Sequence, residues 1–152
     1  EELHLSCLLA SLSFPSPVSQ PKRKMKFFLV LTVLCLATSG AFACSALSCS
    51  DLKNLANTYF ASNYRNDMIC IAYYESSWCP SAENPSGASG LWQIMPNIWL
   101  GQSGCPAKGD QNALFNADDN AKCANTVLKQ QGLSAWTTWN NGDCKGWNKC
   151  TV

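Results

Sequence analysis

The sequence is poor in the residues that metal sites are built from. Its only histidine is His4, and no two cysteines have the CxxC spacing. Structural zinc sites in small domains usually combine closely spaced cysteine pairs with histidines. We therefore expect no metal ion, and we expect no other cofactor.

Charge and long apolar runs are also scarce. Charged residues make up 14% of the chain, and residues 44–152 carry seven basic and eight acidic side chains, with no basic cluster that would indicate nucleic acid as a partner. The longest apolar run covers residues 27–37 and is diluted by residues 38–40. About 20 strongly apolar residues are needed to span a bilayer, so we expect no membrane anchor.

The same apolar run instead predicts a secretory signal peptide at residues 25–43. Met25 and Lys26 precede it, and it ends in Ala41-Phe42-Ala43, the small-x-small pattern of a cleavage site. Residues 1–24 show no folding periodicity and are interpreted as an upstream leader that does not fold. Residues 44–152 then form one domain, either extracellular or in a digestive or lysosomal lumen.

Eight cysteines remain in that predicted mature part, the other two lying in the leader and signal peptide. An even number of cysteines in a small secreted chain predicts a disulfide framework, here of four bridges. Each bridge in such a domain typically contributes about 2–5 kcal/mol to stability. The eight are Cys44, Cys49, Cys70, Cys79, Cys105, Cys123, Cys144 and Cys150.

Hydrophobic periodicity predicts a mainly helical domain with, at most, a small β element in its middle. We expect a helix capped by Ser50 and reaching about residue 62, and a second, almost wholly apolar helix from about residue 66 that Pro80 ends. A third long helix begins near Asn116 or Asp118 and stops at Gly132. A short helix follows at residues 135–139. Residues 81–89 are predicted to form a loop or a short hairpin, residues 101–112 are predicted to form a loop, and residues 91–95 fit a helical turn or a strand.

Glu75 is the most unusual residue of this arrangement. It lies at the C-terminal end of the apolar helix, beside Tyr73, Tyr74 and Trp78. Burial there would raise the pKa of its carboxyl group, which is what a general acid needs near neutral pH. The alternatives are an exposed glutamate at the helix end and a buried ion pair.

The sequence around Glu75 resembles that of the bacterial soluble lytic transglycosylases. Residues 75–82 read ESSWCPSA and residues 87–96 read GASGLWQIMP, in the order and at the separation that the family shows. Residues 135–142, AWTTWNNG, are similar to a third family segment, with Trp139 in place of a tyrosine. The resemblance implies a glycosidase with Glu75 as the catalytic acid.

The cysteines are similar in order and context to those of animal c-type lysozymes. That resemblance implies an α+β, mainly α, lysozyme-like fold, in which a helical lobe and a small middle lobe form a cleft, stapled by disulfides. By analogy, the bridges are Cys49–Cys150, Cys70–Cys144 and Cys105–Cys123, and the remaining pair is Cys44–Cys79.

The resemblance also implies a mechanism. Glu75 would protonate the glycosidic oxygen between N-acetylmuramic acid and N-acetylglucosamine while an oxocarbenium-like transition state develops. Gln93 and Ser89 would bind sugar in the cleft, and Trp139 and Asn140 would contact the N-acetyl group or the leaving sugar.

One departure concerns the second carboxylate. The c-type enzymes carry an aspartate at the position of Ala88, so a covalent intermediate is not expected. Two outcomes stay open: attack by water, which Glu83 or Asp110 would position, and attack by the sugar's own 6-hydroxyl to give an anhydro product. Both carboxylates are more often ordinary loop residues.

We therefore predict a secreted, monomeric muramidase that acts on bacterial peptidoglycan, for antibacterial defence or digestion. The alternatives are a lytic transglycosylase, and a non-catalytic relative that binds glycan or serves as a partner subunit. The tryptophans could either stack on sugar rings or pack in the core. The two roles are equally expected for Trp139, and core packing is favoured for Trp136.

Overall fold

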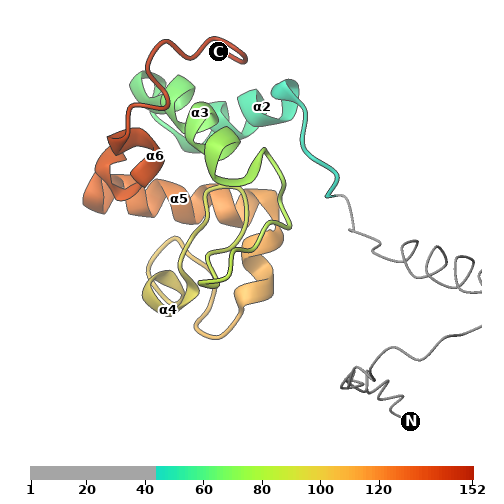
Figure 1. The fold of residues 1–152 in the computed structure, drawn as a ribbon. Helices are drawn as coiled ribbons and strands as arrows, with labels where there is room; N and C mark the ends of the chain where they lie inside the picture. The colour runs from blue at the N-terminus through green and yellow to red at the C-terminus, as the bar shows by residue number, and fades with distance from the viewer. Residues whose placement is uncertain (1–43) are drawn as a thin grey trace, which may run out of the picture. The chain divides into compact units, whose positions relative to one another are not determined.

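The computed structural model describes residues 44–152 (Figure 1). The predicted leader and signal peptide, residues 1–43, lie outside the described residues. Within residues 44–152 no helix is long and apolar enough to cross a membrane.

Helices dominate the described part, as predicted. Two isolated antiparallel bridges, Glu83–Ser89 and Ser89–Ile94, are its small β element. In Figure 1, α2, α3, α5 and α6 form a helical lobe, and the loop-rich residues 80–116 with α4 form a smaller one. The elements are α2 (Cys49–Tyr59), η2 (Ser62–Tyr64), α3 (Arg65–Ser76), α4 (Pro96–Trp99), η3 (Gln111–Phe115), α5 (Ala117–Gln131), η4 (Leu133–Ala135) and α6 (Thr137–Asn140).

Helix α2 begins earlier than predicted, because Ser48 rather than Ser50 caps it. The Asp51 backbone N–H donates to Ser48 Oγ (3.2 Å), and the Ser48 backbone N–H donates to the Asp51 carboxylate (2.9 Å). This reciprocal capping box satisfies two backbone donors that the helix itself leaves free. The prediction of Ser50 overlooked the acidic residue three positions after Ser48.

Helix α3 ends before Pro80, which the sequence had suggested as its terminator. Ser77 takes a left-handed conformation (φ 52°), and its backbone N–H donates to the Tyr73 carbonyl (2.8 Å). Trp78 follows with φ 61°, and its indole N–H donates to the Ile69 carbonyl (3.1 Å). This anchored left-handed turn stops the helix directly after Glu75 and Ser76.

Helix α5 confirms its predicted boundaries. Asn116 caps it by accepting hydrogen bonds from the backbone N–H groups of Asp118 (3.0 Å) and Asp119 (3.1 Å), and Gly132 ends it. The two aspartates in the first turn also suit the positive end of the helix dipole.

Residues 91–95 form a buried turn rather than a helix or a strand, and α5 anchors it. Asn120, fully buried, donates to the carbonyls of Ser89 (3.0 Å) and Leu114 (2.9 Å) and accepts from the Trp92 backbone N–H (2.9 Å). Gly90 allows this close approach, because its φ is +79° and a β-carbon there would overlap the Asn120 side chain.

Replacing Asn120 by alanine should lower the free energy of unfolding by about 3 kcal/mol, because three buried backbone groups lose their partner. Urea unfolding would measure the loss. Asn125→Ala, on the same helix, is the matched control, since the Asn125 side chain has no hydrogen-bond partner within residues 44–152. Equal midpoints for the two variants would contradict the anchoring role.

The four predicted disulfides are confirmed. Cys49–Cys150 and Cys70–Cys144 join residues 101 and 74 positions apart and tie the C-terminal tail to α2 and α3. Cys105–Cys123 ties the small lobe to α5, and Cys44–Cys79 ties the segment before α2 to the turn after α3.

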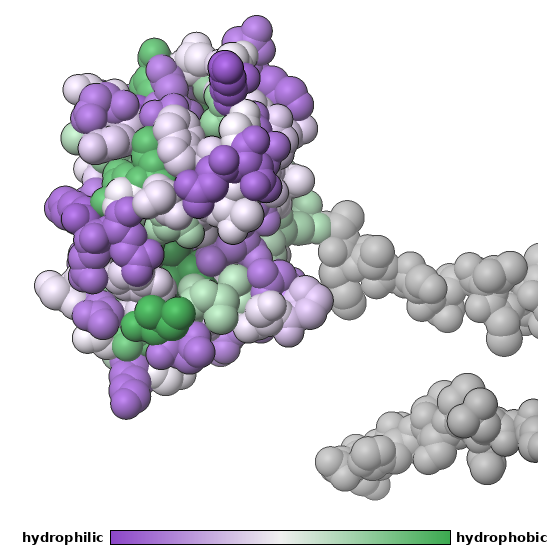
Figure 2. Space-filling view, turned by 60° about the vertical axis from the view of Figure 1, so that its left-hand side comes forward, coloured by the Kyte–Doolittle hydropathy of each residue, from purple (hydrophilic) through white to green (hydrophobic). Residues whose placement is uncertain are grey.

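The surface drawn in Figure 2 is largely hydrophilic, with hydrophobic residues in small separate groups. The large hydrophobic side chains that stand exposed within residues 44–152 are Tyr74, Ile98 and Val152, at 44%, 55% and 49%.

Candidate active site

Glu75 lies in the last turn of α3, half-buried, three positions after Ala72, where the fully buried run that starts at Met68 ends. The apolar residues hold the helix inside the domain, and the left-handed turn at Ser77 ends it. The carboxylate is therefore held at the edge of the core, with limited access to water.

A hydroxyl group from α6 contacts this carboxylate. Thr138 Oγ1 donates to Glu75 Oε1 at 2.8 Å. Burial raises the pKa of Glu75 above its ordinary value, and the hydrogen bond from Thr138 offsets part of that effect. The balance keeps Glu75 protonated to higher pH than a free glutamate, as a proton donor requires.

Sequence reasoning missed Thr138. It lies inside the segment 135–142 that the resemblance singled out, between the two tryptophans Trp136 and Trp139. A threonine there carries no periodicity signal, and its contact with Glu75 joins residues 63 positions apart. The Cys70–Cys144 bridge links the middle of α3 to the chain just after α6, which helps to hold the two helices together.

Gln93 lies half-buried in the turn that follows Gly90, with an unusual φ of +47°. Its amide nitrogen donates to the carbonyls of Ala82 (3.2 Å) and Gly90 (3.0 Å), so the side chain braces the loop. Within residues 44–152 no donor reaches Gln93 Oε1. That oxygen is the atom of this side chain left for a sugar, and the predicted contact stays a prediction.

Ser89, also predicted to bind sugar, is fully buried. Its hydroxyl donates to the Gly87 carbonyl (2.9 Å) and accepts from the Gln111 side chain (3.1 Å), so both of its hydrogen-bonding roles are already filled. This burial argues against direct contact with a substrate. In the structure, Ser89 stabilises the small lobe through these hydrogen bonds.

The predicted contacts on α6 differ in exposure. Trp139 is half-buried, whereas Asn140 is exposed and donates to the Ser134 carbonyl (2.9 Å). Trp92 and Trp136 belong to the core, and their indole N–H groups donate to the carbonyls of Met68 (2.8 Å) and Trp92 (3.0 Å). Of these tryptophans, Trp139 alone keeps substantial exposed surface for stacking on a sugar.

The other candidate carboxylates have structural partners. Glu83 accepts from the Gln111 side chain (2.9 Å), the same amide group that holds the buried Ser89. Asp110 accepts from the Ala113 backbone N–H (3.3 Å) and caps η3. Ala88 is itself buried, so the position where c-type enzymes carry an aspartate offers no carboxylate.

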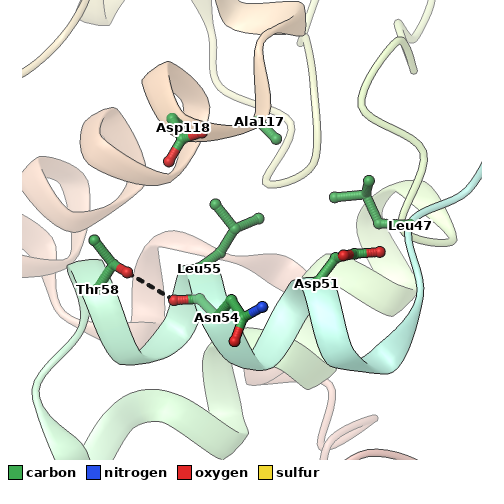
Figure 3. A pocket seen from close by; sticks show the side chains of 7 residues that line it. All are labelled: Leu47, Asp51, Asn54, Leu55, Thr58, Ala117 and Asp118. Carbon is green, nitrogen blue, oxygen red and sulfur yellow. Dashed lines mark hydrogen bonds between the residues drawn. The ribbon is translucent and has the colours of Figure 1, made fainter.

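A pocket away from Glu75 lies between α2 and the start of α5 (Figure 3). Its acidic groups are already engaged, since Asp51 belongs to the capping box and Asp118 accepts from the Tyr59 hydroxyl (2.8 Å). None of the predicted site residues lines it, so it is not the candidate active site. The lining residues are Leu47, Asp51, Asn54, Leu55, Thr58, Ala117 and Asp118.

Glu75 is also not among the residues that line three further pockets of residues 44–152. The predicted cleft shared by Glu75 and Gln93 therefore stays a prediction. Within residues 44–152 no group of three or more histidine, cysteine, aspartate or glutamate side chains is arranged to hold a metal ion.

Comparison with known proteins places the chain in a family. Residues 56–142 match the Transglycosylase SLT domain. Lysozyme D of Drosophila melanogaster is 33% identical over 139 residues, which cover 81% of this chain and 94% of the relative. Lysozyme-like protein 4 of Mus musculus is 31% identical over 126 residues, covering 76% and 87%. With its mainly helical, four-disulfide fold, the chain belongs to the lysozyme superfamily.

Proposed function

We propose that this protein is a secreted muramidase, which hydrolyses the β-1,4 bond between N-acetylmuramic acid and N-acetylglucosamine in bacterial peptidoglycan. The observation that carries the proposal is the half-buried Glu75, whose pKa is raised by burial and whose carboxylate is held by Thr138. Relatives named as lysozymes support it.

The chemistry starts with Glu75 as general acid. Its proton passes to the glycosidic oxygen while the bond from that oxygen to the anomeric carbon breaks and positive charge develops on the ring. Since Ala88 offers no carboxylate to form a covalent intermediate, a water molecule attacks the anomeric carbon. With inversion, this water attacks the face of the ring opposite Glu75, and the proton that it loses passes to the solvent on that face.

A second candidate is lytic transglycosylation, which the Transglycosylase SLT domain match favours. There the sugar's own 6-hydroxyl attacks, and the product is a 1,6-anhydro sugar that is lighter by one water molecule. We favour hydrolysis because the cysteine framework and the relatives are of the lysozyme kind. The four disulfides and these relatives also support an extracellular or digestive location. A monomer is part of the proposal as the usual state of such small secreted enzymes.

The experiment is clearing of a bacterial cell-wall suspension, followed by mass analysis of the released muropeptides. Reducing ends that contain one added water support the muramidase. Anhydro ends support the transglycosylase. Binding to walls without any clearing supports the non-catalytic relative. A protein that neither binds nor clears walls would contradict all three hypotheses.

Replacing Thr138 by valine should move the alkaline limb of the kcat/KM profile to higher pH. The reason is that the Thr138 hydrogen bond lowers the pKa of Glu75, so without it Glu75 stays protonated further up the pH scale. Thr138→Ser should restore the original profile. Thr137→Val, an exposed neighbour, is the matched control. If the alkaline limb of the kcat/KM profile stays at the same pH in Thr138→Val, the hydrogen bond does not affect the pKa of Glu75.

A further inference from the structure

Four aromatic rings gather at the C-terminal end of α3, where Glu75 lies. Tyr73 and Tyr74 directly precede Glu75, Trp78 follows in the left-handed turn, and Trp147 comes from the C-terminal tail. The centroid of the Trp147 ring lies 4.9 Å from that of Tyr73, 5.8 Å from that of Tyr74 and 6.4 Å from that of Trp78. We call these four rings the aromatic platform.

The platform is held in place covalently. Trp147 lies between Cys144 and Cys150, which are bridged to α3 and α2, and its indole N–H donates to the Cys150 carbonyl (3.2 Å). The Trp78 indole N–H is likewise anchored on the Ile69 carbonyl. Rings that are already ordered lose little conformational entropy when a ligand binds to them.

A cation lies on this platform. Lys149 Nζ is 3.0 Å from the Tyr73 hydroxyl oxygen, 4.2 Å from the centroid of the Tyr73 ring and 5.6 Å from that of Trp147. The hydrogen bond to Tyr73 raises the pKa of Lys149, so the ammonium group stays charged. Within residues 44–152 no carboxylate is among its partners.

The parts of the platform that a ligand can reach are the Tyr74 ring and Lys149, because Trp147 packs at steep angles against Tyr74 (61°) and Trp78 (83°). Tyr74 is 44% exposed and Lys149 is exposed, while Tyr73, Trp78 and Trp147 are half-buried. Aromatic faces suit the C–H faces of a pyranose ring, and an ammonium group beside them attracts a carboxylate. The combination therefore fits a sugar that carries an acidic substituent. A neutral sugar would offer the Lys149 ammonium group no carboxylate to pair with.

We propose that the aromatic platform and Lys149 bind a peptidoglycan sugar together with its carboxylate-bearing substituent. This inference rests on the proposed function and adds a selectivity, for acidic over neutral N-acetylated glycans. A membrane surface is the weaker occupant, because attraction to anionic lipids takes a cluster of cations and residues 44–152 hold seven basic against eight acidic side chains.

The test measures binding of two soluble glycans to Glu75→Gln protein, in which the substrate is not consumed. One probe is a peptidoglycan tetrasaccharide with its stem peptides, and the other is neutral chitohexaose. Adding Lys149→Gln should weaken tetrasaccharide binding about fivefold, the range of an exposed charge pair, with chitohexaose binding unchanged. Lys149→Arg should keep most of the affinity, and the difference should shrink in high salt.

Two further variants complete the design. Tyr74→Ser should weaken binding of both glycans, because it removes an exposed ring that contributes little to the core. Lys145→Gln changes an exposed lysine of the same tail and should affect neither probe. Thermal unfolding of each variant establishes that the fold is retained.

The outcomes separate this inference from the proposed function. Unchanged tetrasaccharide binding in Lys149→Gln overturns the platform even if the wild type clears cell walls. Selective loss of binding supports the platform even if the wild type releases no hydrolysed product. Loss of binding to phosphatidylserine vesicles in Lys149→Gln, with both glycans bound as before, would assign the patch to a membrane and overturn the proposal.

Discussion

Glu75→Gln should lower the rate of cell-wall clearing by about 10²–10⁴-fold, the usual contribution of a positioned general acid. Glutamine keeps the size of the side chain and can still accept the hydrogen bond from Thr138. It cannot release a proton to the glycosidic oxygen. The initial rate of turbidity loss, measured beside wild type at equal concentration, gives the ratio.

Asp119→Asn is the matched control, because Asp119 is an exposed carboxylate in the first turn of α5 to which no catalytic role is assigned. Its clearing rate should stay within about twofold of wild type. Equal clearing by Glu75→Gln and wild type would remove Glu75 from its role, and the proposed mechanism with it.

Stability gives an independent check on the same residue. A carboxyl group whose folded pKa is raised favours the folded state while it is protonated, and this contribution is lost as the pH rises through the folded pKa. Burial raises the pKa of Glu75. The stability of Glu75→Gln relative to wild type should therefore increase as the pH rises from about 4 through that raised value. A pH-independent difference would mean that Glu75 is solvated like a surface residue.

Removing the Cys70–Cys144 bridge should cost about 4 kcal/mol of unfolding free energy. The bridge joins residues 74 positions apart, and the loop entropy that it removes from the unfolded chain grows with that separation. Both cysteines are also buried, so the double alanine variant loses packing as well. Urea unfolding of the double variant beside wild type would measure the effect.

The Cys105–Cys123 pair provides the comparison, since it joins residues 18 positions apart and should contribute about 3 kcal/mol on the same basis. Loss of Cys70–Cys144 should also reduce clearing, because that bridge holds α3 beside the segment that follows Thr138. A variant without this bridge that is as stable and as active as wild type would contradict both expectations.

Much of the fold follows from local sequence. The apolar run before Glu75 predicts a buried helix, and Asn116 and Gly132 mark the ends of α5, because periodicity and capping act over a few neighbouring residues. The cysteine pairing followed from resemblance to the c-type lysozymes. For Glu75 the sequence left burial, an exposed helix end and a buried ion pair open, and the structure shows the side chain half-buried.

Other features were decided by tertiary structure alone. Thr138 meets Glu75, Lys149 meets Tyr73, and Ser89 is enclosed by Gln111. Each contact joins residues between 22 and 76 positions apart. A periodic pattern reports which face of a helix is apolar but not which distant side chain will be packed against it. The proposed proton donor, Glu75, could thus be inferred from its own neighbours in the chain. Its contact with Thr138 and the contact of Lys149 with Tyr73 depend on how the helices and the disulfide-bonded tail pack together.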